Sequence, residues 1–379
     1  MRYKKIFWIY PGKLETSLDR ATWLETSKYL KEYGWNVEIA SADLNKGWIS
    51  EQKIKITSFS RPNLYLFSNI LFHFLVAIRI VLSLNKIDVI LFNQDSVPIM
   101  GLLYLFIKKL KRRPYFILDN RSLPMAETTA KEKIRTRFIT WANIAAKKLF
   151  DGQTAITNRM AEALKIPKET LLAVWPSGVN YEDFKYSSIN RKARNEGSML
   201  RLIYIGSIYR ERNLFEMCQA VDELATEGYP VSILLVGDGP DRQELQSKYT
   251  FSHSISILPS VPGQLVPYIL ANADVGVLPF PDEERFRVSS PIKLFEYLAA
   301  GMPILATKIA CHTDVIRQNC VFWAENASVS SLSAAILNAL GNDGKFKEMQ
   351  LLALEESKNH TWEIAAKMLS DGLNNSLFY

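Results

Sequence analysis

The segment RVSSPIKLFEYLAAGMPILAT (287–307) holds residues whose types and spacing suit the binding of an anion. Ser290 is a good helix N-cap and Pro291 suits the first helical position, so a helix is predicted to begin there. The backbone amides of Ile292 and Lys293 are then left free at the positive end of the helix dipole. A phosphate group is the natural ligand for such a helix start.

Lys293 and Glu296 are the only charged residues in the apolar run of this helix, and a spacing of three places them on one face. Two interpretations stay open. In the first, the two side chains form an exposed ion pair on the one wet stripe of a packed helix. In the second, Lys293 lies near phosphate and Glu296 accepts hydrogen bonds from ribose hydroxyls.

The strand-like run YFILDNR (115–121) ends in polar residues. A plain turn and helix cap explains Asp119 and Asn120 as well as a binding role does. Arg121 is more informative, because an arginine at the carboxyl edge of a strand can bind a sugar, a phosphate or an anionic acceptor. Gly12 follows the first predicted strand, where it either lets backbone amides approach a diphosphate or forms a simple tight turn.

Several kinds of site are missing from the sequence. It has no G-x-x-x-x-G-K-[ST] and no full G-x-G-x-x-G, which disfavours a nucleoside triphosphatase and a dehydrogenase. The four histidines are scattered without zinc-ligand spacing, and no D-x-D occurs, so we expect neither a metal nor another cofactor. The three scattered cysteines suit a reducing compartment, and we expect the protein to be cytoplasmic.

Strands that alternate with helices must position these residues, and 379 residues suggest two domains. The first half shows short apolar runs, typical of a parallel sheet covered by helices on both faces. A helix is predicted from about 19 to 33, with Gly34 as its end. The predicted strands of the first half are KIFWIY (5–10), VEIASA (37–42), DVILFN (88–93), YFILDN (115–120), GQTAIT (152–157) and LLAVW (171–175).

A polar stretch at 181–199 has the composition of a linker, and the alternation begins again after it. The expected fold class is α/β, with one domain over 1–180 and a second over 181–361. The chain is helical from Ser328 onward, and a last helix at about 362–379 packs back on the first domain. The predicted strands of the second half are RLIYIGS, VSILLVGDG, SISIL, ADVGVLPF, MPILAT and VFWA, with helices beginning near Arg212, Pro240, Gly263, Pro291 and Thr313.

The net charge of +7 divides unevenly, because residues 1–180 carry +13 (28 basic, 15 acidic) and the remainder −6 (18 basic, 24 acidic). The run Lys108, Lys109, Lys111, Arg112, Arg113 follows the apolar stretch PIMGLLYLFI. Basic and apolar surface together favour the inner membrane surface over a nucleic acid as a partner, and a solvated helix end is the alternative. The apolar stretch 64–84 carries His73 and Arg79, so a buried or membrane-facing helix fits better than a membrane span.

Five segments, in matching order and spacing, resemble the family 4 glycosyltransferases, which have the GT-B fold of two facing Rossmann-like domains with a cleft between them. The resemblance covers most of residues 175–320 and is looser in the first half. The segments are WPSGVNYEDF (175–184), LIYIGSIYRERNLFEMCQAVDEL (202–224), ILLVGDGPDRQEL (233–245), VPYILANADVGVLPF (266–280) and SPIKLFEYLAAGMPILAT (290–307).

The resemblance implies that Glu296 is the second glutamate of the family's E-x7-E motif, which holds the nucleotide ribose. The first glutamate is absent, because its position is Val288. Glu283, Glu284 or the backbone amides around Ser289 and Ser290 would take its place.

The family's basic pair falls on Arg210 and Arg212. A lysine is usual at the position of Arg212, and an arginine can replace it because its guanidinium binds phosphate through two N–H groups. Gly206, Gly237 and Gly239 each either line the donor site or form a tight turn, and we favour Gly206, with Ser207, for the site and the other two glycines for a turn. The histidine that many members carry after the strand at 115–120 is absent, and Asp119, Asn120 and Arg121 stand there instead.

By this resemblance the chain moves a sugar from a nucleotide-sugar donor to a glycan or lipid-linked acceptor, in surface-polysaccharide assembly. Transfer would retain the anomeric configuration without a metal, with Arg210, Arg212, Lys293 and the helix start stabilising the leaving diphosphate. Domain closure about the 180–199 linker would exclude water. Two alternatives are a nucleotide-sugar epimerase of GT-B fold and a non-catalytic partner subunit. The sequence does not reveal whether the donor carries UDP, GDP or another nucleotide.

Overall fold

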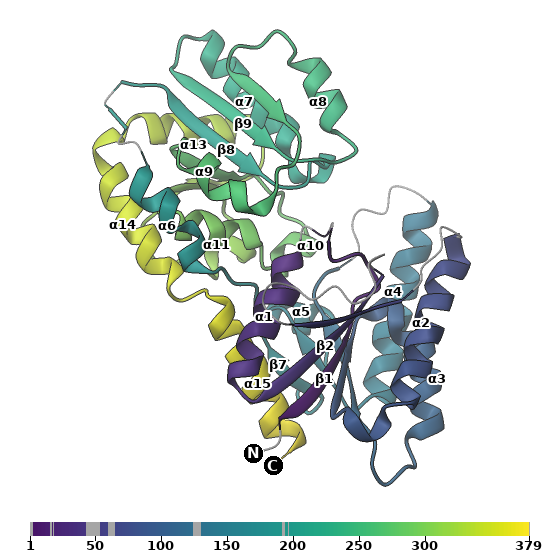
Figure 1. The fold of residues 1–379 in the computed structure, drawn as a ribbon. Coiled ribbons are helices and arrows are strands. Elements are labelled where there is room, and N and C mark those ends of the chain that lie inside the picture. The colour runs from purple at the N-terminus through teal and green to yellow at the C-terminus, as the bar shows by residue number, and fades with distance from the viewer. Residues whose placement is uncertain are drawn as a thin grey trace. The chain divides into compact units, whose positions relative to one another are not determined.

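Two compact units make up the protein, each built around its own parallel sheet (Figure 1). One unit joins Met1–Ser177 to Trp362–Tyr379, and the other is Gly178–Thr361. The structure is a computed structural model, and it describes residues 3–15, 17, 19–42, 54–59, 65–123, 130–191, 194–195 and 197–378.

The sheet of the first unit has seven parallel strands in the order β3-β2-β1-β4-β5-β6-β7. Its strands are short and mostly buried, as helices on both faces of a sheet require. The strands are β1 Lys4–Ile9, β2 Trp35–Ser41, β3 Lys55–Ser58, β4 Val89–Phe92, β5 Tyr115–Asn120, β6 Gly152–Ala155 and β7 Leu171–Val174.

Three helices, α2, α3 and α4, share one hydrophobic core with the sheet of the first unit. Phe72, Met100 and Ala142, one from each helix, pack there with Phe92 and Phe116 of the strands. Helices α1 and α15 contact each other, and they contact β2 and β7 respectively. The helices of this unit are α1 Arg20–Glu32, α2 Tyr65–Val81, α3 Val97–Ile107, α4 Ala130–Leu149, α5 Asn158–Ala163 and α15 Trp362–Leu377.

Helix α15 follows the second unit in sequence but belongs to the first. The indole Nε1 of Trp35 donates a hydrogen bond of 3.0 Å to the Ser370 hydroxyl, and both residues are buried. A Cβ at Gly372 would lie 2.3 Å from the Leu172 carbonyl oxygen, so α15 approaches β7 more closely than a side chain permits. The first unit is therefore made from two separate stretches of chain.

The second unit has six parallel strands in the order β10-β9-β8-β11-β12-β13. These strands are β8 Leu200–Ile205, β9 Val231–Val236, β10 Ile255–Leu258, β11 Val275–Leu278, β12 Ile304–Thr307 and β13 Val321–Ala324. The helices are α6 Tyr181–Asn190, α7 Leu214–Thr226, α8 Arg242–Lys248, α9 Val266–Leu270, α10 Glu284–Arg287, α11 Ile292–Ala299, α12 Ala310–Thr313, α13 Val329–Leu340 and α14 Phe346–Ser357.

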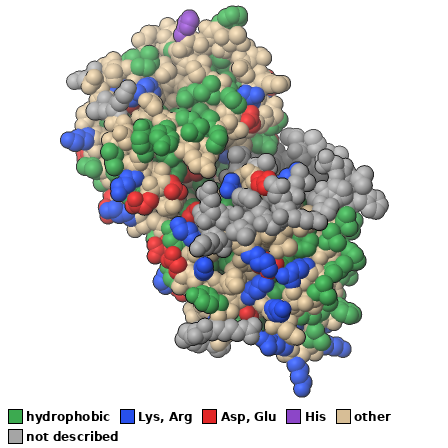
Figure 2. Space-filling view, viewed as in Figure 1, with side chains coloured by type: hydrophobic (Ala, Val, Ile, Leu, Met, Phe, Trp, Pro, Cys, Tyr) green, Lys and Arg blue, Asp and Glu red, His purple; other side chains and the backbone are tan. Residues whose placement is uncertain are grey.

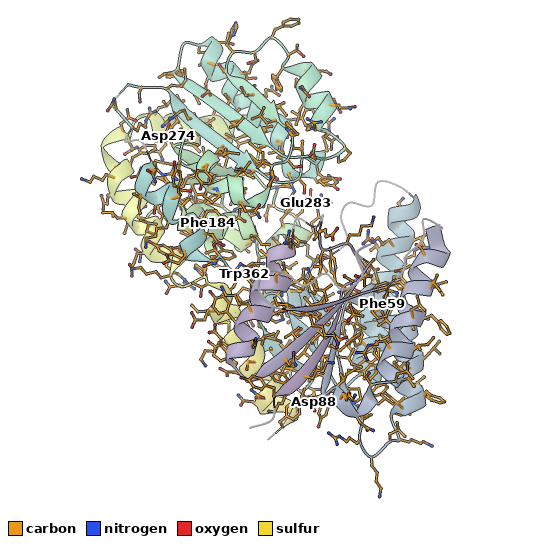
Figure 3. All side chains as sticks on the ribbon, in the orientation of Figure 1. Phe59, Asp88, Phe184, Asp274, Glu283 and Trp362 are labelled. Atoms are coloured by element: carbon orange, nitrogen blue, oxygen red, sulfur yellow. The ribbon has the colours of Figure 1, made fainter. Side chains whose placement is uncertain are left out.

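The predicted linker at 181–199 is wrong, because its first ten residues form α6 and are packed into the second unit. Phe184 is buried in the core of that unit (Figure 3). The hydroxyl of Ser187 donates a hydrogen bond to the carbonyl oxygen of Pro267. The guanidinium of Arg191 donates to the carbonyl oxygens of Leu270 and Ala300 at 3.0 and 2.9 Å. The boundaries between the two units lie at Ser177/Gly178 and Thr361/Trp362, outside this segment.

Other elements also differ from the sequence prediction. Strand β3 at the sheet edge and the one-turn helix α10 were not predicted. The helix expected to begin near Thr313 instead ends there, as the short α12. The apolar stretch at 64–84 forms α2 up to Val81, and residue 64 lies outside the described residues. β3, α10 and α12 have only four residues each, too few for a hydrophobic period to appear.

A buried carboxylate ties three strands and a helix together in the first unit. Glu38 of β2 is ion-paired with Lys5 of β1 at 2.5 Å and with Arg79 of α2 at 3.1 Å, and Thr57 of β3 donates to it at 2.8 Å. Burial alone raises the pKa of Glu38, but the hydrogen bonds from Lys5 and Thr57 and the charges of Lys5 and Arg79 lower it to about 2. Arg79 thus has a structural partner inside the fold.

Candidate functional site

The carboxyl edge of the six-stranded sheet gathers most of the residues that the sequence singled out. Ligands of open α/β sheets bind at this edge. The loop after β8 lies against the loop after β9, since the Gly206 amide donates to the Val236 carbonyl oxygen at 3.0 Å. A Cβ at Gly237 would lie 1.7 Å from the Gly206 carbonyl oxygen, so only glycine fits there. The backbone at this edge is thereby held tightly in place.

Arg212 is directed into this edge. Its guanidinium lies over the Phe280 ring at 5.3 Å, and its Nε has no partner among the described residues. Burial raises the pKa of Tyr204, while the charge of Arg212 opposes that rise. The same charge opposes the rise in the pKa of Tyr297 that burial produces. Arg212 is therefore a cation beside two buried tyrosines, with hydrogen-bonding capacity to spare.

Arg210 is engaged elsewhere. Its guanidinium is ion-paired with Glu244 of α8 at 2.5 Å and stacks on the Phe215 ring of α7 at 3.6 Å. Its amide donates to Asp241 at 2.7 Å. Of the two predicted arginines, the structure brings Arg212 to the buried tyrosines, while Arg210 closes the loop onto α8.

The predicted start of the helix at 290–307 needs a correction. Pro291, not Ser290, occupies the N-cap position of α11, and the helix begins at Ile292. Ser290 is buried before the cap, and the Ser289 hydroxyl donates to the Phe286 carbonyl oxygen at 2.8 Å. Proline has no side-chain oxygen to cap the helix, and its φ of −70° is already close to helical. Within the described residues, the amides of Ile292 and Lys293 have no acceptor.

The Lys293 ammonium and the Glu296 carboxylate form an ion pair of 2.6 Å on α11. Both side chains are largely buried, so the pair is not the freely solvated one of the first interpretation. Glu296 is also close enough for its charge to raise the pKa of Tyr297, the tyrosine on which Arg212 acts. Arg212 and the Lys293–Glu296 pair thus share one neighbour.

Val288 lies buried at the end of α10, and its side chain supplies no carboxylate there. Two glutamates were proposed to replace the missing one. Glu283 (Figure 3) is ion-paired with Arg285, and Glu284 is exposed to solvent. Arg285 is nearly buried, and its Nε has no partner among the described residues.

Sequence reasoning missed several residues of this edge. The Tyr297 hydroxyl accepts a hydrogen bond from the Ile205 amide at 3.0 Å, which ties α11 to the end of β8. The Thr307 hydroxyl donates to the Phe280 carbonyl oxygen at 2.7 Å. Burial lowers the pKa of His312 to about 4, so this histidine is neutral at pH 7. Tyr297 and Thr307 lie within the segment SPIKLFEYLAAGMPILAT, but their residue types alone did not indicate a part in the site, and His312 lies on α12 outside the quoted segments.

In the first unit, the carboxyl end of β5 holds Asp119 and Asn120 as buried strand residues. The alternative of a turn and helix cap is therefore wrong. One oxygen of Asp119 accepts from the Thr154 hydroxyl at 2.7 Å and from the Trp175 indole at 3.2 Å. Burial raises the pKa of Asp119, and the charge of Arg121 opposes that rise. This oxygen of Asp119 holds Trp175, while the other is buried without a partner among the described residues, so the predicted catalytic role of Asp119 stays a prediction.

Arg121 lies flat on the indole that Asp119 holds. Its guanidinium is 3.7 Å from the Trp175 ring centre, and its Nη1 donates to the Trp175 carbonyl oxygen at 3.3 Å. Its Nη2 is buried and has no partner in the described part of the chain. Burial lowers the pKa of Arg121, and the charges of Asp119 and Asp19 oppose that fall. A buried guanidinium with an unused donor is suited to an anionic or hydroxyl-rich ligand.

Gly12 follows β1 at the same edge. Its carbonyl oxygen accepts from the Ala42 amide at 2.9 Å, and a Cβ there would lie 2.8 Å from the Tyr10 ring. The glycine is therefore explained by packing against Tyr10, and its predicted role toward a diphosphate stays a prediction.

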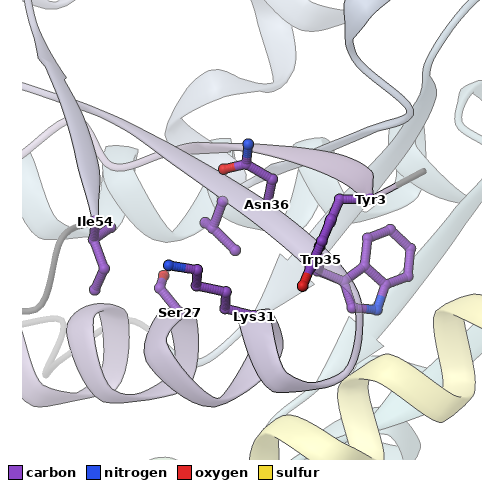
Figure 4. A pocket seen from close by; sticks show the side chains of 7 residues that line it. Tyr3, Ser27, Lys31, Trp35, Asn36 and Ile54 are labelled. Atoms are coloured by element: carbon purple, nitrogen blue, oxygen red, sulfur yellow. The ribbon is translucent and has the colours of Figure 1, made fainter. Parts of the chain in front are cut away.

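The hollow in Figure 4, of about 220 Å³, lies away from these residues. Its lining includes Tyr3, Trp35 and Asn36, at the amino ends of β1 and β2. The described residues contain no group of three or more His, Cys, Asp or Glu arranged to hold a metal ion. The expectation that no metal is needed stays a prediction.

Comparison with protein families gives a match over residues 200–342 to the model described as glycosyl transferases group 1. This stretch contains Arg212, Lys293 and Glu296. It also contains most of the segments on which the sequence resemblance rested.

Two curated relatives are similar to this chain. The Bacillus subtilis protein TuaC, assigned as a teichuronic acid biosynthesis glycosyltransferase, is 25% identical over 187 residues, 48% of this chain and 45% of TuaC. The GDP-mannose-dependent alpha-(1-6)-phosphatidylinositol dimannoside mannosyltransferase of Mycobacterium tuberculosis is 23% identical over 238 residues, 61% of this chain and 59% of that protein. The chain thus spans about half the length of the curated relatives it matches.

Among solved structures, HepE from Anabaena in complex with UDP and glucose has a TM-score of 0.75 to this chain, at 12% identity. The match covers 98% of this chain and 99% of HepE. Such a likeness shows the fold: two Rossmann-like parallel sheets of the GT-B class, as the sequence predicted.

Proposed function

Because residues 200–342 match the model of the group 1 glycosyltransferases and two curated glycosyltransferases are similar to this chain, we propose that it transfers a sugar from a nucleotide-sugar donor to a glycan or lipid-linked acceptor. The observation that carries this proposal is the edge of the second sheet, where Arg212 and the Lys293–Glu296 pair share Tyr297 as a neighbour. Breaking a glycosidic bond to a diphosphate places negative charge on the leaving group. Preorganised cations and free amides stabilise that charge in the transition state.

Each group at this edge has a distinct part in the proposal. Arg212 and the amides of Ile292 and Lys293 bind the diphosphate of the donor. Glu296 accepts hydrogen bonds from the ribose, and its ion pair with Lys293 keeps the lysine ammonium beside it. Three sources of positive potential then face one leaving group, which is why we propose that no metal ion is required.

The first unit supplies the acceptor side in this proposal. Arg121, held on the Trp175 indole, has a buried donor without a partner among the described residues. Aromatic faces and hydrogen-bond donors together suit a sugar or its anionic substituent. We propose a retaining reaction in surface-polysaccharide biosynthesis, in which the acceptor hydroxyl attacks from the face that the diphosphate leaves.

The donor nucleotide follows from a release experiment. The purified protein is incubated with a panel of UDP-, GDP- and other nucleotide sugars, with and without EDTA, and the freed nucleotide is measured. We expect release from one class of donor at an equal rate with EDTA. Release that requires added manganese would contradict the metal-free mechanism, and no release from any donor would favour a non-catalytic partner subunit.

The variant Glu296→Ala tests the site itself. We expect it to lower donor turnover by about 100-fold, since it removes a ribose contact and frees Lys293 from its partner. The matched control is Glu355→Ala, which breaks a similar ion pair between residues three apart, with Lys358 of the same unit. Equal turnover in the two variants would remove Glu296 from the site.

A further inference from the structure

One helical layer of the first unit has an outer surface that folding does not explain. Helix α3 contacts α2 on one side and α4 on the other, so the three lie next to one another over the sheet. We call them the α2–α4 layer. Its inner side is buried in the hydrophobic core of the unit. A helix that covers a sheet needs only that one apolar side.

The outer side of the α2–α4 layer is apolar as well. Figure 2 shows hydrophobic side chains gathered where α2 and α3 lie in Figure 1. Phe106 is 83% exposed and Leu102 66% exposed. The same surface includes Phe74 and Ile78 of α2 and Trp141 and Ile144 of α4, all exposed. A contiguous apolar patch on a protein whose remaining surface is polar marks a binding face.

Exposed basic residues adjoin this apolar surface. Lys108, Lys109, Lys111 and Arg112 follow α3 directly, and Arg135 and Arg137 lie on α4. No ion pair of these six side chains occurs among the described residues. The sequence of α2 and α3 contains no Asp or Glu. Arg113 is the exception in the basic run, because it forms hydrogen bonds of 2.7 Å with both oxygens of Asp151 and belongs to the fold.

A hollow of about 480 Å³ lies where the ends of α2 and α3 meet. Its lining combines the cations Lys86, Lys111 and Arg112 with the apolar side chains of Leu82 and Leu110, and contains no acidic residue. Cations next to apolar side chains suit the interfacial region of a phospholipid bilayer, where the phosphate of the headgroup adjoins the acyl chains.

From this surface we infer that the α2–α4 layer docks on an anionic lipid bilayer, with its helices lying in the interface. No helix in the described ranges is long and apolar enough to cross a membrane. A second copy of the chain is a poor occupant, because two such faces would bring unpaired cations together. The charge of the surface selects an anionic lipid, and its exposed Phe, Leu and Trp side chains insert beneath the headgroups. This inference is independent of the proposed sugar transfer.

Flotation with vesicles tests the inference on the full chain. Vesicles of phosphatidylcholine alone are compared with vesicles of two parts phosphatidylcholine to one part phosphatidylglycerol. We expect binding only to the second kind at low salt. Binding should weaken in about 1 M salt, where the Debye length falls to about 3 Å.

Two variants test the two parts of the surface. Phe106→Ser removes apolar contact, and Lys108→Glu with Lys109→Glu reverses charge; each should lower vesicle binding by about tenfold or more. The matched controls lie in the second unit: Phe251→Ser, at a phenylalanine 93% exposed, and Lys345→Glu with Lys347→Glu. Both controls should bind as the unchanged chain does.

Three results would overturn the inference. The first is that the chain does not float with anionic vesicles at low salt. The second is that both layer variants float as the unchanged chain does. The third is that the protein is a dimer that Phe106→Ser separates, which would make the face an interface between copies. Circular dichroism of each variant shows whether it is folded. The charge-reversal pair alters only exposed residues, so it remains informative if Phe106→Ser does not fold.

Discussion

The helices that cover the two sheets differ in what they present to solvent. Helix α3 of the first unit exposes Leu102 and Phe106, whereas α7 of the second exposes Gln219 and Glu223, which are joined by a hydrogen bond of 2.8 Å. Both helices bury an apolar side against a parallel sheet. The shared architecture thus requires one apolar side, and the second apolar side of α3 needs a cause other than folding.

The carboxyl edges of the two sheets also differ. The edge of the second unit holds Arg212 and the Lys293–Glu296 pair, while that of the first holds Asp119 and Arg121 around an indole. Cations and free amides suit a diphosphate, and an arginine on an aromatic ring suits a sugar or its substituent. Under the proposed function, this difference corresponds to a donor side in the second unit and an acceptor side in the first.

The largest expected effect separates the two arginines of the second edge. Arg212→Ala should lower kcat/KM by about 100-fold or more, because a cation at the leaving group is lost. Arg210→Ala should change it by less than about fivefold, since half-exposed ion pairs of this kind contribute little. Steady-state kinetics with the donor found by nucleotide release measures both. An equal loss in the two variants would show that Arg210 also reaches the diphosphate.

A smaller effect concerns the stability of the first unit alone. Glu38→Gln should lower the free energy of unfolding of the first unit by about 3 kcal/mol at pH 7, because Lys5 and Arg79 lose the charge of their buried partner. The folded pKa of Glu38, about 2, lies below the ordinary value of 4.5. The carboxylate therefore stabilises the fold fully above pH 4.5, and this contribution is lost as pH falls toward 2.

Hydrogen exchange followed by mass spectrometry locates this effect. Exchange should quicken in peptides of β1, β2 and α2 and stay unchanged in β8 to β13. The control Glu355→Gln alters an exposed ion pair and should leave both sheets unchanged. Faster exchange throughout the chain would mean that the two units unfold as one.

The smallest effect tests whether residues 181–190 belong to the second unit. Ser187→Ala should lower the stability of that unit by about 1 kcal/mol, since the buried carbonyl oxygen of Pro267 loses the hydrogen bond from the Ser187 hydroxyl and keeps only that from the Ala271 amide. The neighbouring Ser188 is only partly buried and its hydroxyl donates within α6, to the Lys185 carbonyl oxygen, so Ser188→Ala is the matched control. Urea unfolding compares the two. Identical curves would mean that the segment behaves as the linker its composition suggests.

Buried strands were the part of the fold that the sequence predicted best. Runs such as VILF and VGVL are apolar throughout because helices cover both faces of each sheet. Strand β3 was missed because KITS is short, lies at a sheet edge and is only partly buried. Helix α6 was missed because long-range hydrogen bonds from Ser187 and Arg191 hold it, and no periodicity records such bonds.

The candidate site was predictable where a residue type implies its chemistry. A lysine and a glutamate three apart in an apolar helix had to share a face, and the structure pairs them. The sequence did not separate Arg210 from Arg212, because the partners that distinguish them, Glu244 and Tyr204, come from other elements. Tertiary contacts of this kind leave no trace in local spacing.

The return of α15 to the first unit affects how the protein is made. The second unit is continuous in sequence, so all of its residues leave the ribosome before Trp362 does. Most of the first unit is synthesised earlier, but α15, which packs on α1 and β7, is missing from it until the residues up to Leu377 have emerged. A nascent chain must therefore keep that apolar surface from aggregating while the later unit folds. The last turns of α15 thus decide when the first unit is complete.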